Sequence, residues 1–183
     1  MKRQIRSSVF ETNSSSTHSI AISKAPAVVG KSIHFGIGEF GWENDTANTA
    51  DYLYTAILYV YSPDVADEKI EHLKRVLDKY DVSYQFEEPK YWTGSSGYEY
   101  LDNGYIDHGD ELTEFLAAIF SNEDLLMRYL FGDSTVYTGN DNQDNEPSGC
   151  NIAEAEYYDW VSGGWMANPY HDPVNYEYFY KGN

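Results

Sequence analysis

The sequence has little cysteine, few basic residues and no long apolar run. Cys150 is its one cysteine, so no disulfide can form within the chain and sulfur ligands are too few for a cysteine-based zinc site. No apolar run approaches the roughly 18 residues that a membrane-spanning helix requires. The polar start, residues 1–4, leads into no apolar signal segment. These absences predict a cytoplasmic protein.

The scarcity of basic residues is concentrated in one part of the chain. The 183 residues include 30 acidic and 12 basic side chains, which gives a formal charge of −18. Residues 82–183 hold nineteen of the acidic side chains but three of the basic ones, whereas residues 1–81 are nearly balanced. Such a negative field repels nucleic acid and anionic membranes. The charge therefore favours a basic partner protein, with acidity that serves only solubility as the alternative.

The rest of the composition is typical of a folded domain. Hydrophobic residues make up 42% of the chain and aromatic residues 16%, whereas disordered tails are poor in aromatics. Two domains would each have a small core at this length, and no repeat or flexible linker divides the sequence. We therefore expect residues 1–183 to form a single domain.

Hydrophobic periodicity predicts both strands and helices. Alternating positions predict strands over 4–10, 19–24, 32–38, 82–86, 135–137 and 176–180. Helical spacing predicts four helices, over 46–61, 64–80, 110–120 and 121–130, with Pro63 separating the first two and Gly132 ending the last. We expect Ser121 to cap the fourth helix, a polar loop at 11–17, a connection at 91–104 and a second polar loop at 139–149. The prediction is an α+β fold, a mixed or antiparallel sheet with about four helices packed on it.

Residues 11–19 bring hydroxyls, a carboxylate and an imidazole close together in sequence. Nucleophilic catalysis by Ser and His requires their reacting atoms within about 3 Å and an oriented base, which proximity in sequence does not supply. The alternatives are local turn capping and a loop that presents polar groups to an anion or a partner. The candidate loop contacts are Glu11, Asn13, Ser14, Ser15, Ser16 and His18.

Residues 8–20, Ser-Val-Phe-Glu-Thr-Asn-Ser-Ser-Ser-Thr-His-Ser-Ile, resemble the N-terminal signature of a group of phage and bacterial proteins. Some phage proteins of this size and acidity are anti-CRISPR inhibitors of type II RNA-guided nucleases. The resemblance covers about twenty of the 183 residues and supplies no catalytic residue. It implies a phage origin and a host defence target, in agreement with the charge argument.

Metal binding finds weak support in the sequence. A calcium-binding EF-hand loop that began at Asp141 would need glycine at its sixth position and glutamate at its twelfth, but the sequence has Glu146 and Ile152 there. The five histidines include no pair spaced to bind zinc from one helix. His108, with two acidic neighbours, is more typical of a histidine without a metal. We predict no metal.

A nucleotide cofactor is not expected either. The glycines of residues 36–41 lack the spacing of a phosphate-binding loop, and Glu39 would stand where a phosphate would bind. The sequence therefore predicts no cofactor.

Acidic residues interleaved with aromatics remain as the candidate binding site. Carboxylates can replace phosphates opposite arginine side chains, on which exposed Tyr and Trp can also stack. On a continuous helix, Asp110 and Glu114 would lie on one face, where a basic partner would relieve their repulsion. The predicted partner-binding residues are Asp107, Asp110, Glu111, Glu114, Glu123, Asp124, Glu154, Glu156 and Asp159.

These observations lead to three hypotheses of function. The first is a stoichiometric inhibitor, a DNA mimic that occupies the basic surface of a host defence nuclease, in its most concrete form a type II CRISPR RNA-guided nuclease. The second is an acidic phage protein with a structural or regulatory role. The third is a small enzyme that uses a Ser/His site in residues 11–19.

Overall fold

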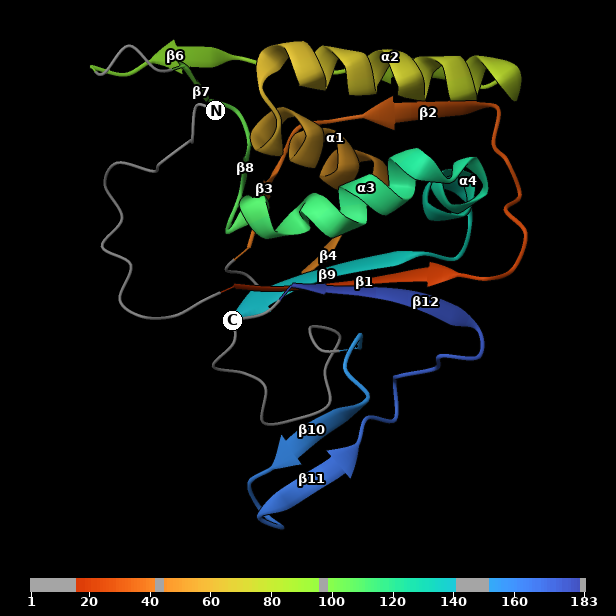
Figure 1. Ribbon diagram of the computed structural model, residues 1–183, viewed down its shortest axis with the longest axis vertical. Helices are drawn as coiled ribbons and strands as arrows, with labels where there is room; N and C mark the ends of the chain where they lie inside the picture. Colours follow the sequence, from red (N-terminus) through yellow and green to blue (C-terminus); the bar gives the residue numbers. More distant parts are fainter. Residues whose placement is uncertain (1–15, 42–44, 96–98, 141–151, 182–183) are drawn as a thin grey trace.

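The fold is built on a four-stranded antiparallel sheet with helices on one face. The computed structural model describes residues 16–41, 45–95, 99–140 and 152–181. The strand order in the sheet is β12, β1, β9, β4, and all its pairings are antiparallel. Its strands are β1 (Ser16–Ser23), β4 (Asp45–Ala47), β9 (Thr135–Asn140) and β12 (Tyr176–Lys181). In Figure 1 the helices lie above this sheet and a hairpin projects below it.

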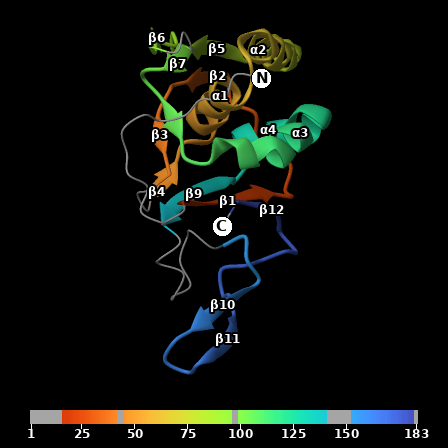
Figure 2. The ribbon, with the colours of Figure 1, turned by 60° about the vertical axis from the view of Figure 1, so that its left-hand side comes forward.

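The four predicted helices are confirmed within the described residues. They are α1 (Thr49–Val60), α2 (Pro63–Lys79), α3 (Thr113–Ser121) and α4 (Glu123–Phe131), and the 3₁₀ helix η1 (Gly109–Leu112) precedes α3. Figure 2 shows α1, α3 and α4 between the sheet and α2, which lies farther from the sheet. No helix in the described part of the chain is long and apolar enough to cross a membrane.

The other described strands form pairs. Two pairs are parallel, β2 (Ser32–Phe35) with β5 (Ser83–Phe86) and β3 (Glu39–Phe40) with β8 (Tyr105–Ile106). Two are antiparallel, β6 (Tyr91–Thr93) with β7 (Glu99–Leu101) and β10 (Glu156–Asp159) with β11 (Gly164–Ala167). Helices and mostly antiparallel strands together confirm the predicted α+β class.

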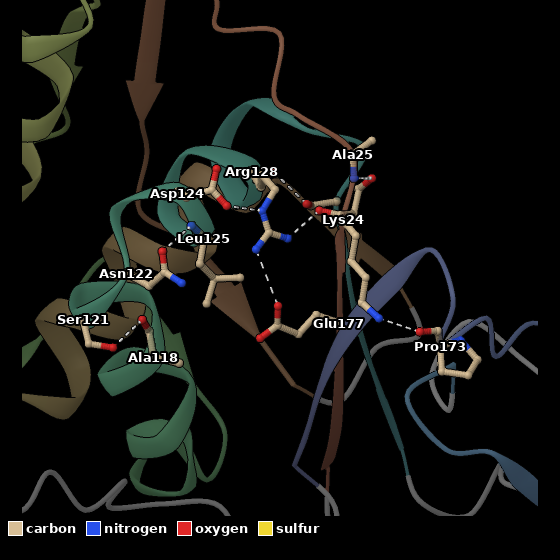
Figure 3. A network of polar contacts seen from close by, with 12 residues as sticks. Lys24, Ala25, Ala118, Ser121, Asn122, Asp124, Leu125, Arg128, Pro173 and Glu177 are labelled. Carbon is tan, nitrogen blue, oxygen red and sulfur yellow. Dashed lines mark hydrogen bonds and ion pairs between the residues drawn. The ribbon is translucent and has the colours of Figure 1, made fainter.

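Capping residues set two helix starts that differ from the prediction. The carboxamide oxygen of Asn48 accepts hydrogen bonds from the backbone N–H groups of Ala50 (2.9 Å) and Asp51 (3.1 Å), so α1 begins at Thr49 and the residues before it form β4. Asn122 caps α4 in the same way, accepting from the N–H of Leu125 at 3.2 Å (Figure 3). The predicted cap, Ser121, is instead the last residue of α3.

Several strands also differ from the prediction. The strand β1 begins at residue 16, inside the predicted loop. The predicted connection over 91–104 contains β6 and β7, and the pair β10–β11 was not predicted at all. The predicted strand over 4–10 and most of the loop over 139–149 lie outside the described residues.

Aromatic rings form the centre of the core between the helices and the sheet. The ring of Tyr52, on α1, meets Phe40 at 5.3 Å and Phe115 at 6.4 Å between centroids. Phe115 also meets Tyr129 at 5.2 Å and Phe179 of β12 at 5.5 Å. All four pairs are edge-to-face, a geometry that adds roughly 0.5–1.5 kcal/mol per pair beyond area burial. These contacts fix α1, α3 and α4 on the sheet.

We predict that the protein loses stability at alkaline pH, because Tyr54 is buried in the protonated form. Its hydroxyl donates to the backbone oxygen of Glu87 at 3.0 Å. Burial, followed by the nearby Tyr91, Glu87 and Asp67, raises the pKa of Tyr54 from 10.0 to about 12. In the unfolded chain this tyrosine ionises at a lower pH than in the folded protein. The stability that protonated Tyr54 contributes is therefore complete below pH 10 and is lost as the pH rises toward 12.

Urea unfolding at a series of pH values measures this loss. The free energy of unfolding should fall by about 1–3 kcal/mol more in the natural chain than in Tyr54→Phe across that range. Parallel pH profiles for the two chains would contradict the prediction.

Candidate functional site

The predicted acidic residues lie on two sides of the sheet. Glu114, Glu123 and Asp124 belong to α3 and α4, in the helix layer. Glu156 and Asp159 belong to β10, and Glu154 precedes it. Figure 1 shows this strand on the opposite side of the sheet from the helices. The candidate residues therefore do not form one continuous patch.

Asp107 is buried, which contradicts the exposed position predicted for it. Its side chain is 4% exposed, and its backbone N–H donates to the carbonyl of Phe40 at 2.9 Å, next to the β3–β8 pair. A Cβ added at Gly41 would lie 2.5 Å from the Cβ of Asp107, and Gly41 has a φ of +154°. Gly41 and its neighbours thus pack closely against Asp107.

The turn before α3 also changes the predicted acidic face. Asp110 and Glu111 lie in η1, and the α-helix begins only at Thr113. The continuous helix that would place Asp110 and Glu114 on one face is therefore absent here. Glu114 is exposed in the first turn of α3, while the side chains of Asp110 and Glu111 lie outside the described structure.

Glu123 forms an ion pair within the chain. Its carboxylate accepts from Nζ of Lys79 at 2.6 Å, linking α4 to α2. The hydrogen bond from Lys79 lowers the pKa of Glu123, and the same contact raises the pKa of Lys79. Exposed pairs of this kind add little to stability. Glu123 is nevertheless partly neutralised before any partner arrives.

Asp124 belongs to a network around the almost buried Arg128 (Figure 3). Nε of Arg128 donates to Asp124 Oδ2 at 2.8 Å, and Nη1 donates to the backbone oxygen of Ser23 at 2.8 Å. Nη2 lies 3.6 Å from Oε2 of Glu177 on β12. One guanidinium group thus connects α4 to two strands, and Asp124 has a structural partner.

We predict that this network depends on Arg128 far more than on Asp124. Arg128→Met leaves the carbonyl of Ser23 without its side-chain donor and should lower the free energy of unfolding by about 1–3 kcal/mol. Asp124→Asn removes an exposed carboxylate and should cost less than about 1 kcal/mol. Urea unfolding compares the two variants. Equal losses would show that the exposed ion pair, and not the bond to β1, holds the arginine.

Ser16 and His18 are buried in β1, so their assignment to an accessible loop is wrong. Nε2 of His18 lies 3.2 Å from Oγ of Ser16, and Nδ1 lies 2.7 Å from the hydroxyl of Tyr52 on α1. The imidazole therefore faces the helix layer. The other candidate loop residues, Glu11, Asn13, Ser14 and Ser15, lie outside the described part of the chain.

The Ser16–His18 pair is better explained by core structure than by catalysis. Its distance suits a nucleophile and base, but both side chains are fully buried. Burial also raises the pKa of Tyr52, so its hydroxyl stays protonated and can donate to Nδ1. An imidazole that accepts this bond at Nδ1 has Nε2–H available to donate to Ser16. The three groups satisfy one another's polar atoms inside the core.

The variant Tyr52→Phe tests this role. It removes the hydroxyl beside Nδ1 and should lower the free energy of unfolding by about 1–3 kcal/mol, because a buried polar atom loses its partner. Tyr100→Phe, at a half-buried tyrosine of β7, is the matched control and should change stability by less than about 0.5 kcal/mol. Similar small losses in both variants would contradict the role.

The glycine-rich turn after β2 is closed by the chain's own oxygens. The N–H groups of Gly36, Ile37 and Gly38 donate to Asp51 Oδ1 (2.6 Å), Glu87 Oε2 (2.9 Å) and Thr55 Oγ1 (3.1 Å). A phosphate would need such amides unoccupied. The turn therefore serves to join β2 to α1 and to the segment after β5.

Acidic and histidine side chains do not gather into a metal site in the described ranges, where no three or more His, Cys, Asp or Glu residues are placed to hold an ion. His108 has a left-handed backbone conformation, with a φ of 50°. The loop that begins at Asp141 lies outside the described residues.

Sequence reasoning missed the aromatic hairpin β10–β11. Its turn and second strand expose Trp160, Val161, Trp165 and Met166. Asp159 builds the turn, accepting from the N–H groups of Val161 (3.0 Å) and Ser162 (3.2 Å). Hydrogen bonds from Ser162 and Val161 lower the pKa of Asp159. The pair Gly163-Gly164, flanked by aromatic residues, was the available signal.

Comparison with known proteins adds no relative. No protein-family model matches the chain, and neither a curated protein nor a solved structure matches it. The resemblance of residues 8–20 stays a prediction. The candidate site therefore depends on this chain's own surface: an aromatic hairpin with exposed Glu156, and separately Glu114 on the helix side.

Proposed function

We propose that this protein is a stoichiometric inhibitor that binds the basic, nucleic-acid-binding surface of another protein. The first target to test is a type II CRISPR RNA-guided nuclease of a bacterial host. In this proposal the protein acts in the cytoplasm and is not itself an enzyme.

The uneven charge is the observation that carries the proposal. Residues 82–183 contain nineteen acidic and three basic side chains, a field that attracts cationic surfaces and repels free nucleic acid. In RNA-guided nucleases, arginines read a short duplex motif and a basic channel holds the nucleic acid. Carboxylates that occupy these arginines would compete with DNA.

The placement of side chains supports binding over catalysis. Ser16 and His18 are buried, so two of the residues that a Ser/His enzyme would use are not at the surface. Glu114 and Glu156 are exposed on opposite sides of the sheet, so each can be tested separately. A structural or regulatory role remains the alternative if no basic partner binds.

Titration of a purified type II RNA-guided nuclease tests the proposal. DNA cleavage should stop near one molecule of this protein per nuclease, and inhibition should weaken as salt screens the charges. Inhibition by trace amounts would instead indicate an enzyme. Unchanged cleavage across several such nucleases would remove this target.

Charge reversal then identifies the side of the molecule that binds. Glu156→Lys and Glu114→Lys change the charge equally on the hairpin and on α3. Glu68→Lys, at an exposed position of α2, is the matched control in the balanced part of the chain. We expect Glu156→Lys to weaken inhibition by about two- to tenfold more than the control. Equal effects of all three would mean that only net charge matters.

A further inference from the structure

A hairpin with large apolar side chains projects from the side of the sheet opposite the helices. The strands β10 and β11 form a two-stranded sheet of their own, and in Figures 1 and 2 they are the part of the molecule farthest from the helices. Trp160 and Trp165 are each 68% exposed and Val161 is 97% exposed. Large exposed apolar groups gathered in this way mark interaction sites.

The aromatic rings at the tip are ordered by one another. Tyr158 lies between the two tryptophans, with centroid distances of 4.8 Å to Trp160 and 5.6 Å to Trp165, both edge-to-face. Tyr158 and Trp165 are also cross-strand partners. Asp159 and Gly163 close the turn between them, with the N–H of Gly163 donating to the carbonyl of Asp159 at 2.8 Å. Rings held in this way lose little conformational entropy on binding.

The root of the hairpin is attached to the sheet. The N–H of the buried Asn168 donates to the carbonyl of Ala155 at 2.8 Å. The ring of His171 stacks on Tyr178 of β12 at 4.5 Å, and the Tyr178 hydroxyl accepts from the N–H of Asp172 at 2.8 Å. The contacts with Tyr178 attach the segment that follows the hairpin to β12.

The charge around the hairpin indicates what kind of partner would bind it. Glu156 is exposed and stands two positions before Tyr158, so both occupy one face of the strand, together with Trp165. No Lys or Arg occurs from residue 129 to residue 180. On the helix side, by contrast, Glu123 and Asp124 have cationic partners. The hairpin combines apolar rings with negative charge, and Lys24 contacts the carbonyl of Pro173 at its root.

We propose that the β10–β11 hairpin is the anchor of the partner interface, and that its partner is a protein surface with an apolar pocket rimmed by arginine. Trp160 and Trp165 would fill the pocket, and Glu156 would pair with a guanidinium group stacked on an indole. Arginine suits this site because it stacks on aromatic rings and binds carboxylates at once. A second copy of this chain or an anionic membrane would bring like charges together. The inference rests on the proposed function and specifies its interface.

Two probes test the anchor separately from the choice of target. One is the purified type II nuclease, measured by inhibition of DNA cleavage. The other is a synthetic amphipathic peptide with Arg on one face and Leu on the other, measured by tryptophan fluorescence and calorimetry. The variants are Trp160→Ala/Trp165→Ala, Glu156→Gln and the control Trp92→Ala, at an exposed tryptophan of β6 that stacks on Tyr100.

The double tryptophan variant should lose about 30-fold or more in affinity for the probe that binds. Glu156→Gln should lose about two- to fivefold, and Trp92→Ala should match the natural chain. Because the tip is exposed, the double variant should keep its far-ultraviolet circular dichroism and its Tm. An affinity equal to that of the natural chain would overturn the anchor.

The probes distinguish failure of the anchor from failure of the proposed function. An uninhibited nuclease together with tryptophan-dependent peptide binding would remove the type II nuclease as the proposed target and support the anchor. An inhibited nuclease that does not respond to the double variant would overturn the anchor and leave the function. Binding of neither probe by the natural chain would overturn the anchor. Self-association or binding to anionic vesicles that disappears in the double variant would also overturn it.

Discussion

The burial of β1 is the constraint on which the rest of the fold depends. All eight of its residues are buried, and its two neighbours in the sheet, β9 and β12, come more than a hundred residues later in the chain. The sheet cannot form until these distant segments pair with β1. Such contacts form slowly, because the entropy of closing a long loop is lost before the contacts stabilise the fold.

The pairing also explains where the hairpin lies in the sequence. The chain between β9 and β12 must pass from one side of β1 to the other, and β10–β11 lies in that connection.

Three of the described basic side chains join separate parts of the fold. Lys24 donates to the carbonyl of Pro173, at the root of the hairpin, at 2.6 Å. Lys79 joins α2 to α4, and Arg128 joins α4 to the sheet. The negative charge of residues 82–183 thus reflects where the scarce basic residues lie in the sequence, as well as the number of carboxylates.

Elements with a clear hydrophobic period could be predicted from the sequence, and strands without one could not. The helices α1 and α2 have apolar residues at helical spacing, and β5 alternates half-buried and exposed positions. The strand β6 is exposed throughout, and β11 is exposed at three of its four positions, so neither has a hydrophobic period to detect. Their pairing depends on turns and aromatic contacts between strands.

The candidate site was only partly predictable for a related reason. Composition showed which part of the sequence holds the excess of negative charge, but not which side chains pack around each candidate residue. The burial of Asp107 follows from the β3–β8 pair beside it, and that of His18 from the tyrosine that α1 places against it. Both contacts join segments far apart in sequence. A polar run such as residues 11–19 has the composition of a loop, although its last four residues form a buried strand in this fold.

Charge and aromatic surface would contribute to binding in different ways. Salt screens attraction between exposed charges beyond about 8–10 Å at physiological ionic strength, so the acidic surface mainly affects the rate of encounter and its direction. Burial of indole rings acts only on contact and is far less sensitive to salt, so it affects the lifetime of the complex. An acidic body alone would bind many basic proteins weakly. In the proposed complex, the rings of Tyr158, Trp160 and Trp165 would supply the shape by which one basic surface is distinguished from another.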